Sequence, residues 1–340
     1  ALPAFFPQDK KVVEKYGSKY GSSSKDMVYD GPFIQKGWTV SNLSWKMIKN
    51  PNYWDKTSVK LTQMNFQVIK DTTTGLNLYN SKKLDETTLS GSQVAQYKNN
   101  KNFVSRKLAQ TSYIEFNQSK NTVLKNKKIR QALSLAIDRD QLTGKVLADG
   151  SVSATGFVSS GLMTDLNNGK DFAAEASVPS GVSYNLQKAK KLMAEGLKEE
   201  NKKTLTLDLL NNDSDVGKKA SEFLQSDWEK LPGVKITLTN IPYKSFLTDE
   251  ANKKFDLALS GWAADFSDPI SFLQILTSDN AQNNGSWKNV AFDKAIEKAD
   301  TTDATNPEKR FKDMIQAEKI LMQDQGVAPI YQSTQAQLWN

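Results

Sequence analysis

The chain has 340 residues, 38% of them hydrophobic and 24% charged, which is enough for two globular domains with separate cores. It contains no Cys and no His, so Ser-His-Asp and Cys-His catalysis and Cys/His zinc sites are excluded, while carboxylate-only sites stay open. The net charge of +7 comes mainly from lysines in every segment, which favours a solvated surface over a nucleic-acid-binding stripe. No apolar run is long enough to cross a bilayer.

The first part of the chain predicts an α+β segment. Strands are expected over 31–38, 44–49, 59–70 and near 84–85, and helices over 10–20, after 74 and over 92–99. Four aromatic residues are expected in its core: Trp38, Trp45, Tyr53 and Trp54. The opening residues, Ala1-Leu2-Pro3, indicate a start in mid-domain rather than a leader.

The pattern changes near residue 110. A strand is expected over 113–117, followed by a helix over 127–137 with apolar residues at helical spacing. Asp138 can cap a further helix, with Gln141 completing the capping box. Helix capping and charge pairing on the helix surface explain Asp138-Arg139-Asp140 better than a functional role of these charges does. The stretch 149–183 is rich in Gly, Ser and Asn and predicts a surface loop.

From residue 184 the pattern resembles βαβ units. Asn185 is expected to cap a helix that Gly196 stops. Strands are expected over 205–209, 234–238 and 255–260, with a helix over 216–231, a last helix from Pro307 and an extended exit over 328–331. Strands that alternate with helices predict a largely parallel sheet, whose ligands lie at the carboxyl ends of the strands.

One of those strand ends, Gly261-Trp262-Ala263-Ala264-Asp265, combines features of a binding corner. Gly261 lets a ligand approach the backbone, and Trp262 offers a flat apolar wall. Asp265 adds a carboxylate, so the corner suits the protonated amino end of a peptide. Two plainer interpretations stay open: Asp265 could cap a turn or pair with a lysine, and Trp262 could be ordinary core.

Four stretches resemble those of a known family. In chain order they are Gly31-Pro32-Phe33 with Trp38 and Asn52-Tyr53-Trp54-Asp55; Lys127-Lys128-Ile129-Arg130-Gln131-Ala132-Leu133 with Ala136-Ile137-Asp138-Arg139; Phe255-Asp256 with Gly261-Trp262, Asp265 and Asp268-Pro269; and Ala328-Pro329-Ile330-Tyr331. Together they resemble the extracytoplasmic oligopeptide-binding proteins (OppA/DppA-like, solute-binding protein family 5) of ABC importers. The resemblance implies an α/β, type II periplasmic-binding-protein-like fold with two lobes and a hinge, α+β in the first segment.

The resemblance also implies that lobe one is incomplete, without its N-terminal part and its C-terminal tail. Residues 1–109 would be the middle segment of lobe one, 110–332 lobe two, and 333–340 the start of the strand that returns to lobe one. The hinge crossings would lie near 107–112 and 329–334. A lipid anchor would sit on the missing N-terminal part, so the protein is expected as a cell-surface lipoprotein of Gram-positive type or as a periplasmic protein.

The implied function is capture of short peptides in a cleft between the lobes and their delivery to an ABC permease. The resemblance implies that the protein acts as a monomer, that it is not an enzyme, and that it needs no cofactor or metal and binds no nucleic acid. The resemblance places these residues at the ligand: Asp265, Trp262, Gly261, Ala263, Tyr113, Asn212 and Tyr331. Leu259 and Ser260 stand where some relatives have a basic residue, which leaves the anchor for the peptide carboxylate open. The alternatives are a receptor for a signalling or cell-wall peptide, a carboxylate-dependent hydrolase, and an adhesive or chaperone-like surface protein.

Overall fold

The computed structural model describes residues 6–69 and 71–340. The opening Ala1-Leu2-Pro3 lies outside the described residues, so its prediction has no structural counterpart. The chain divides into two compact units, 1–87 and 88–340, and each is described by itself. Within the described ranges, no helix has both the length and the apolar character that a membrane crossing requires.

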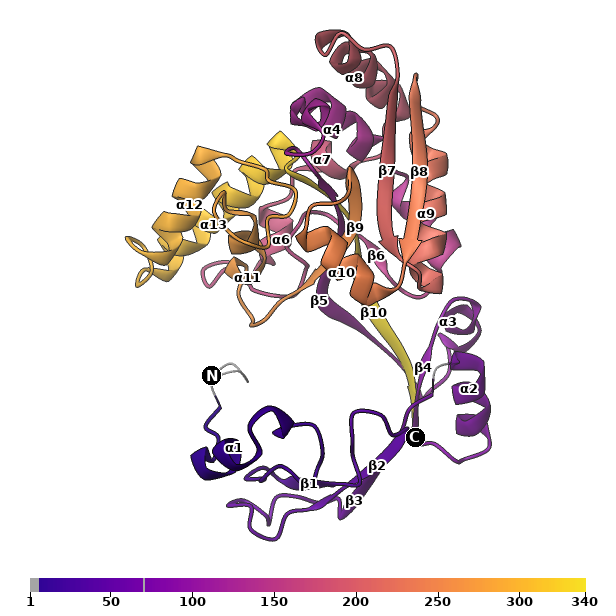
Figure 1. The fold of residues 1–340 in the computed structure, drawn as a ribbon, viewed down its shortest axis with the longest axis vertical. Coiled ribbons are helices and arrows are strands. Elements are labelled where there is room, and N and C mark those ends of the chain that lie inside the picture. The colour runs from indigo at the N-terminus through magenta and orange to yellow at the C-terminus, as the bar shows by residue number, and fades with distance from the viewer. Residues whose placement is uncertain (1–5, 70) are drawn as a thin grey trace. The chain divides into compact units, whose positions relative to one another are not determined.

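The first unit is built on a three-stranded antiparallel sheet in the order β1-β2-β3 (Figure 1). Its elements are α1 (Lys10–Tyr16), a short 3₁₀ turn (Gly17–Lys19), β1 (Phe33–Lys36), β2 (Ser44–Lys49), β3 (Gln63–Gln67) and α2 (Thr72–Asn80). Trp45 of β2 stacks on Phe66 of β3, with ring centroids 5.4 Å apart. The strand predicted over 44–49 is confirmed. The expectation that Trp54 is core is wrong, because it lies in turns between β2 and β3 and is 86% exposed.

The second unit contains a mixed sheet in the order β4-β10-β5-β9-β7-β8, with β6 also on β10. The strands are β4 (Glu86–Leu89), which crosses the boundary between the units, β5 (Phe103–Phe116), β6 (Val152–Ser153), β7 (Leu205–Asn212), β8 (Val234–Ile241), β9 (Leu257–Ala263) and β10 (Val327–Trp339). β7 is parallel to β8 and β9, whereas β5 is antiparallel to both β9 and β10. The prediction of a largely parallel sheet is therefore only half right, because β5 and β10 run against each other through its middle.

Two helical layers cover this sheet and carry the two main cores. Around the first core lie α4 (Lys127–Leu135), α5 (Arg139–Gln141), a π turn (Leu142–Leu147), α8 (Leu186–Glu199) and α9 (Asp215–Trp228). The second core lies against α6 (Phe172–Glu175), α7 (Pro179–Val182), α11 (Ile270–Leu273), α12 (Val290–Asp300) and α13 (Pro307–Asp324). The remaining helices are α3 (Ser92–Tyr97), α10 (Tyr243–Ala251) and two short 3₁₀ turns, Thr122–Lys125 and Gln274–Leu276.

Tertiary packing corrects several local predictions. Gly196 does not stop α8, which continues to Glu199; a Cβ at Gly196 would lie 2.6 Å from Ile129 Cγ1, so the glycine serves the close contact between α8 and α4. The predicted surface loop 149–183 holds β6, α6 and α7 and buries Phe157 and Phe172. The cap at Asp138 is confirmed, since its carboxylate accepts the N–H of Gln141 at 2.9 Å. Helices α10 and α12 were not predicted.

Arg139 is a buried tie rather than a surface charge. It is 3% exposed, and its guanidinium donates to the carbonyl oxygens of Pro329, Ser134 and Val182. Burial lowers the pKa of Arg139 to about 9. The guanidinium thus joins the end of α4 to β10, and the prediction of helix-surface pairing for this residue is wrong.

Along the chain, the boundary between the compact units falls between residues 87 and 88, ahead of the lobe boundary predicted between 109 and 110. β5 begins at Phe103 and pairs with β10 over residues 103–107 as well as 111–115, so residues 103–109 belong with the second unit. The ladder shifts register between Pro329 and Tyr331 and between Gln332 and Thr334, inside the predicted crossing 329–334. The lobe assignment and the hinge stay predictions.

Glu318 of α13 holds the loop that carries Phe157. Its Oε1 accepts the N–H of Phe157 at 2.5 Å, while Oε2 is buried without a partner. Burial raises the pKa of Glu318 from 4.5 to about 7, against the opposing effect of the N–H groups of Phe157 and Val158. The folded chain therefore keeps a proton on Glu318 at pH values where the unfolded chain has lost it.

We expect the free energy of unfolding to fall as pH rises from 4.5 to about 7, because the folded state binds the extra proton across that range. The fall attributable to Glu318 is about 3 kcal/mol, by the conversion of a pKa difference to free energy. Glu318→Gln should remove it, as measured by urea unfolding at a series of pH values. The matched control is Glu308→Gln, an exposed position on the same helix. Equal pH slopes in the Glu318 variant and the parent chain would contradict the assignment.

Candidate functional site

β9 lies between β5 and β7 in the middle of the sheet and carries the predicted corner (Figure 1). The strand continues through Ala263, so Gly261, Trp262 and Ala263 form its last part rather than a turn after it. The expected strand end at 260 is therefore wrong. The reason is tertiary, because Gln110, Thr111 and Ser112 of β5 pair with Ala263, Trp262 and Gly261 in turn.

The hydrogen bonds at both ends of the β5–β9 pairing show toward which neighbouring strand the backbone N–H and C=O groups of each β9 residue point. Asn117 N–H donates to Asp256 O at 2.9 Å, and Ala264 N–H donates to Ala109 O at 2.8 Å. In an antiparallel pair every second residue bonds to the partner strand. Ser260 and Trp262 therefore bond toward β5, whereas Gly261 and Ala263 turn their N–H and C=O groups to the opposite edge.

That opposite edge is open where the corner begins. β7 pairs with β9 only at Leu257 and Ala258, and no pairing beyond Ala258 is recorded on this side for residues 6–69 and 71–340. Gly261 and Ala263 are both exposed. An unpaired strand edge in this state can accept an extended chain through main-chain hydrogen bonds.

The turn after β9 is held by one buried serine. Ser271, at the start of α11, accepts the indole Nε1–H of Trp262 on its carbonyl oxygen at 2.7 Å and the N–H of Asp265 on its Oγ at 2.8 Å. Trp262 is half-buried against the second core. The same turn continues into an ion pair between Asp268 and Arg310, at 2.6 Å.

Asp265 itself is exposed, and no hydrogen bond or ion pair of its carboxylate is recorded within the described part of the chain. The plainer interpretation, a carboxylate that pairs with a lysine or caps a turn, has no contact to support it. Its backbone is fixed by Ser271 while its charge stays open to solvent. The arrangement can therefore meet a cation that arrives from outside.

Gly261 has no structural need to be glycine. A Cβ built there would meet nothing closer than 3.8 Å, from Gln110 Nε2, and its φ lies outside the left-handed region. A glycine inside a strand costs conformational entropy and offers no packing. The space that it leaves is thus available to something other than this chain.

Tyr331 of β10, Ser112 of β5 and Gly261 of β9 lie in one row across three adjacent strands. Tyr113 follows Ser112 and pairs with Ser260. Both tyrosines are buried, with 2% of Tyr113 and 8% of Tyr331 exposed. Tyr113 packs edge-on against Phe157, with centroids 4.9 Å apart. Burial raises the pKa of both phenols, in Tyr113 with a further contribution from the Glu115 carboxyl.

Asn212 lies at the carboxyl end of β7, outside that row. Its Oδ1 accepts the N–H of Ser214 at 3.1 Å, so it shapes the turn into α9. The structure therefore brings the Gly261–Asp265 corner together with Tyr113 and Tyr331, while no recorded contact joins Asn212 to them. All seven stay predicted ligand residues.

Two buried carboxyl groups lie behind the corner. Glu115 of β5 is 1% exposed and Glu250 of α10 is 6% exposed. Burial raises the pKa of both, and in Glu115 the neighbouring Glu250 adds to the effect. This pair is closed to solvent, whereas a carboxylate-dependent hydrolase needs two carboxyl groups at the substrate.

Sequence reasoning missed Ser271 and Ser112 as parts of this site. Ser271 stands two residues after Asp268-Pro269, so its sequence signal was its place in that stretch. Ser112 carried no signal, because its position opposite Gly261 follows only from strand register.

An open strand edge beside an aromatic wall and a free carboxylate can accept an extended ligand, and the fold of the chain is that of a type II periplasmic binding protein. The chain belongs to family 5 of the bacterial extracellular solute-binding proteins, because the model of that family, described as its middle part, matches residues 1–284.

The chain is similar to a dipeptide-binding protein of Lactococcus lactis subsp. cremoris, at 39% identity over 96% of this chain and 62% of that protein. It spans less than two thirds of the length of this relative. Among solved structures it resembles Listeria monocytogenes OppA bound to peptide, at 40% identity and a TM-score of 0.84, over all of this chain and 66% of that one. It also resembles the pheromone receptor PrgZ, at 37% identity and a TM-score of 0.84, over the same shares. The expected α/β, type II binding-protein-like fold is confirmed.

We expect Gly261→Ala to leave the fold intact and to raise the free energy of unfolding by up to about 1 kcal/mol, since the new methyl group makes only ordinary van der Waals contacts, at 3.8 Å or more, and restricts the unfolded chain. Gly285→Ala is the matched control, because its Cβ would lie 2.8 Å from Phe116 O. That variant should lose about 1–3 kcal/mol. Urea unfolding of both variants measures the difference. A Gly261 variant as unstable as the Gly285 variant would show that Gly261 is needed by the fold itself.

Proposed function

We propose that this chain captures short peptides as an added strand on the open edge of β9 and, as the substrate-binding component of an ABC importer, delivers them to its permease. The observation that carries the proposal is the pair of outward-facing backbone positions, Gly261 and Ala263, beside an unpaired carboxylate. Main-chain pairing binds any sequence to a similar degree, which suits a receptor for many peptides.

The ends of the corner have different roles in this proposal. Asp265 accepts the α-ammonium group of the peptide, and Trp262 forms a wall beside its first residues. Gly261 and Ala263 pair with the peptide backbone. The side chains of Tyr113 and Tyr331 are buried, which favours a supporting role over direct contact. Asn212 would border the ligand from the end of β7.

The partners and location follow from the same proposal. Membership of an extracellular solute-binding family supports an extracytoplasmic location. The proposal adds a monomer that meets a permease, with a lipid anchor on a segment outside this chain. The ligands are short peptides rather than nucleic acid, and no cofactor is required. A hydrolase is not favoured, because the carboxyl pair behind the corner, Glu115 and Glu250, is buried.

A second candidate is a receptor for one signalling peptide. Its support is the likeness to the pheromone receptor PrgZ. A panel of unrelated short peptides separates the two candidates, because a general receptor binds most of them with similar affinity, whereas a signalling receptor selects one.

Asp265 and the free amine give a direct test. Calorimetric titration should show that N-acetylation of a short peptide costs about 2–5 kcal/mol of binding free energy, because the covered carboxylate loses its charge partner. Asp265→Asn should weaken binding of the free-amine peptide and make the chain insensitive to acetylation.

The control is Asp279→Asn, an exposed carboxylate elsewhere on the same unit. It should bind like the parent chain. Equal binding of both peptides by the parent chain would remove Asp265 from its role, and failure to bind any peptide of the panel would contradict peptide capture.

Backbone methylation tests the added strand. A peptide strand turns alternate N–H groups toward its partner, so N-methyl groups on one set of alternate residues should block pairing, while the other set is tolerated. Each lost hydrogen bond should cost about 0.5–1.5 kcal/mol, measured by titration of the two methylated peptides. If both methylated peptides bind as tightly as the unmodified peptide, the ligand is held by its side chains instead.

A further inference from the structure

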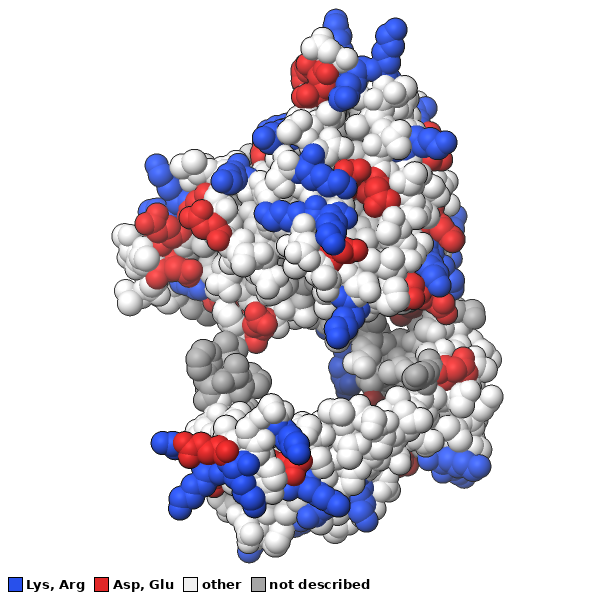
Figure 2. Space-filling model, viewed as in Figure 1, with Lys and Arg blue, Asp and Glu red and all other residues white. Residues whose placement is uncertain are grey.

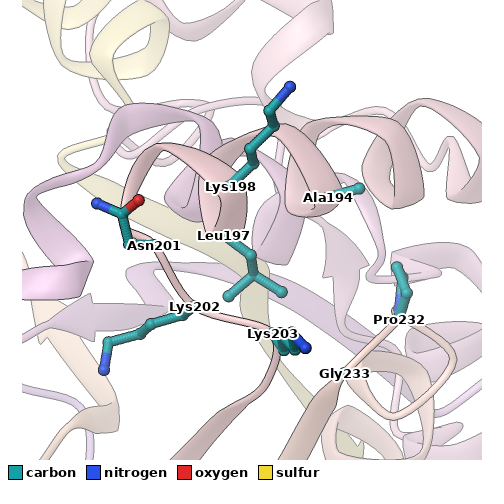
Figure 3. Close-up of a pocket in the computed structure, with 8 residues that line it drawn as sticks. All are labelled: Ala194, Leu197, Lys198, Asn201, Lys202, Lys203, Pro232 and Gly233. Carbon is teal, nitrogen blue, oxygen red and sulfur yellow. The ribbon is translucent and has the colours of Figure 1, made fainter.

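A hollow lies at the end of the second unit opposite the ligand corner. It measures about 520 Å³ and is formed by the end of α8, the loop into β7 and the turn before β8. Figure 3 shows Leu197 at its centre, with Lys198 and Lys202 around it. Leu197 is 4% exposed, so it is a shallow apolar floor rather than a protruding side chain. The complete lining is Ala194, Leu197, Lys198, Asn201, Lys202, Lys203, Pro232 and Gly233.

Acidic and basic side chains separate at this end of α8. Glu195 and Glu199 both pair with Lys128, at 2.9 and 2.7 Å. Glu199 and Glu200 also accept hydrogen bonds from Asn126 Nδ2, at 3.0 and 3.1 Å. The carboxylates are thus bound by residues that begin α4, and none of them lines the hollow.

The three lysines of the hollow keep their charge uncompensated. No ion pair or hydrogen bond of the ammonium groups of Lys198, Lys202 and Lys203 is recorded within 6–69 and 71–340. Blue side chains project from the molecule at the α8 end in Figure 2. A cationic rim around an apolar floor calls for an anionic partner.

The directions of the lysines decide between a single anion and a charged surface. In Figure 3 the ammonium groups of Lys198 and Lys202 point away from each other, rather than toward one point. A phosphate-sized ion needs donors that converge on it, whereas spread ammonium groups match a plane of many anionic head groups. Lysine stems can lie on apolar material while their charges reach such head groups.

The hollow is separate from the ligand corner. It lies at the start of β7, near Leu205, whereas the corner lies at the carboxyl end of β9, which runs parallel to β7. The seven steps from Leu205 to the end of β7 alone span roughly 23 Å. The chain belongs to an extracellular family, so an anionic membrane is a surface that it can meet. Contact through the hollow leaves the open edge of β9 free.

We propose that the hollow formed by Leu197, Lys198, Lys202, Lys203 and Pro232 docks the second unit on an anionic lipid bilayer. This docking does not depend on peptide capture.

Co-sedimentation of the 340-residue chain with vesicles tests the docking. Vesicles of phosphatidylglycerol should retain the chain, whereas vesicles of phosphatidylcholine should not, and about 0.5 M KCl should release it by screening. The variant Lys198→Gln/Lys202→Gln/Lys203→Gln should bind phosphatidylglycerol about 100-fold more weakly, because each lysine near such a surface contributes about fivefold.

A matched variant removes the same charge elsewhere. Lys170, Lys294 and Lys309 are exposed and have no recorded side-chain partner, so their replacement by Gln lowers the net charge equally. This control should bind phosphatidylglycerol far more tightly than the variant of the hollow. Equal losses in the two variants would overturn the proposal in favour of a general charge effect. Absence of binding by the parent chain, or equal binding to phosphatidylcholine, would also overturn it. Tighter binding to polyglutamate than to vesicles would replace the membrane by an acidic protein.

Discussion

The antiparallel pairing of β5 with β10 is the constraint on which the second unit depends. It joins residues 103–116 to residues 327–339 along nearly their whole lengths. β9 takes its register from β5, so Gly261 lies opposite Ser112 because β5 is already fixed on its other side. A slip of one residue would turn the bonding groups of Gly261 and Ala263 toward β5 and close the edge. The corner therefore depends on the pairing of β5 with β10, although neither strand contains Trp262 or Asp265.

The corner combines a rigid frame with an unsatisfied charge. Ser271 is fully buried and fixes both the indole of Trp262 and the backbone of Asp265, so neither has to be ordered when a ligand arrives. Sites built in this way lose less conformational entropy on binding than sites on free loops. Asp265 remains solvated, which keeps the unliganded state free of a buried unpaired carboxylate.

Local signals predicted what local forces decide. Ser44–Lys49 and the cap at Asp138 follow from alternation and capping chemistry, and both are present. Gly196 looked like a helix end, but its missing side chain serves the contact with Ile129 on another helix. Gly261 and Trp262 looked like a turn, yet pairing with distant residues of β5 keeps them extended. The residue types of the corner could be read from the chain, whereas its open edge could not, because the edge is defined by where β7 stops pairing.

The long separation between β5 and β10 also governs the order of events when the chain is made. The central ladder cannot form until residues 327–339 have left the ribosome, so β5 lacks its partner β10 until then. Contacts between segments so far apart slow folding, since a long loop has to be closed before the contact forms. Until residues 327–339 are made, the chain lacks its central ladder and can still be threaded, and threading through a narrow export channel is what a protein of an extracellular family has to undergo first.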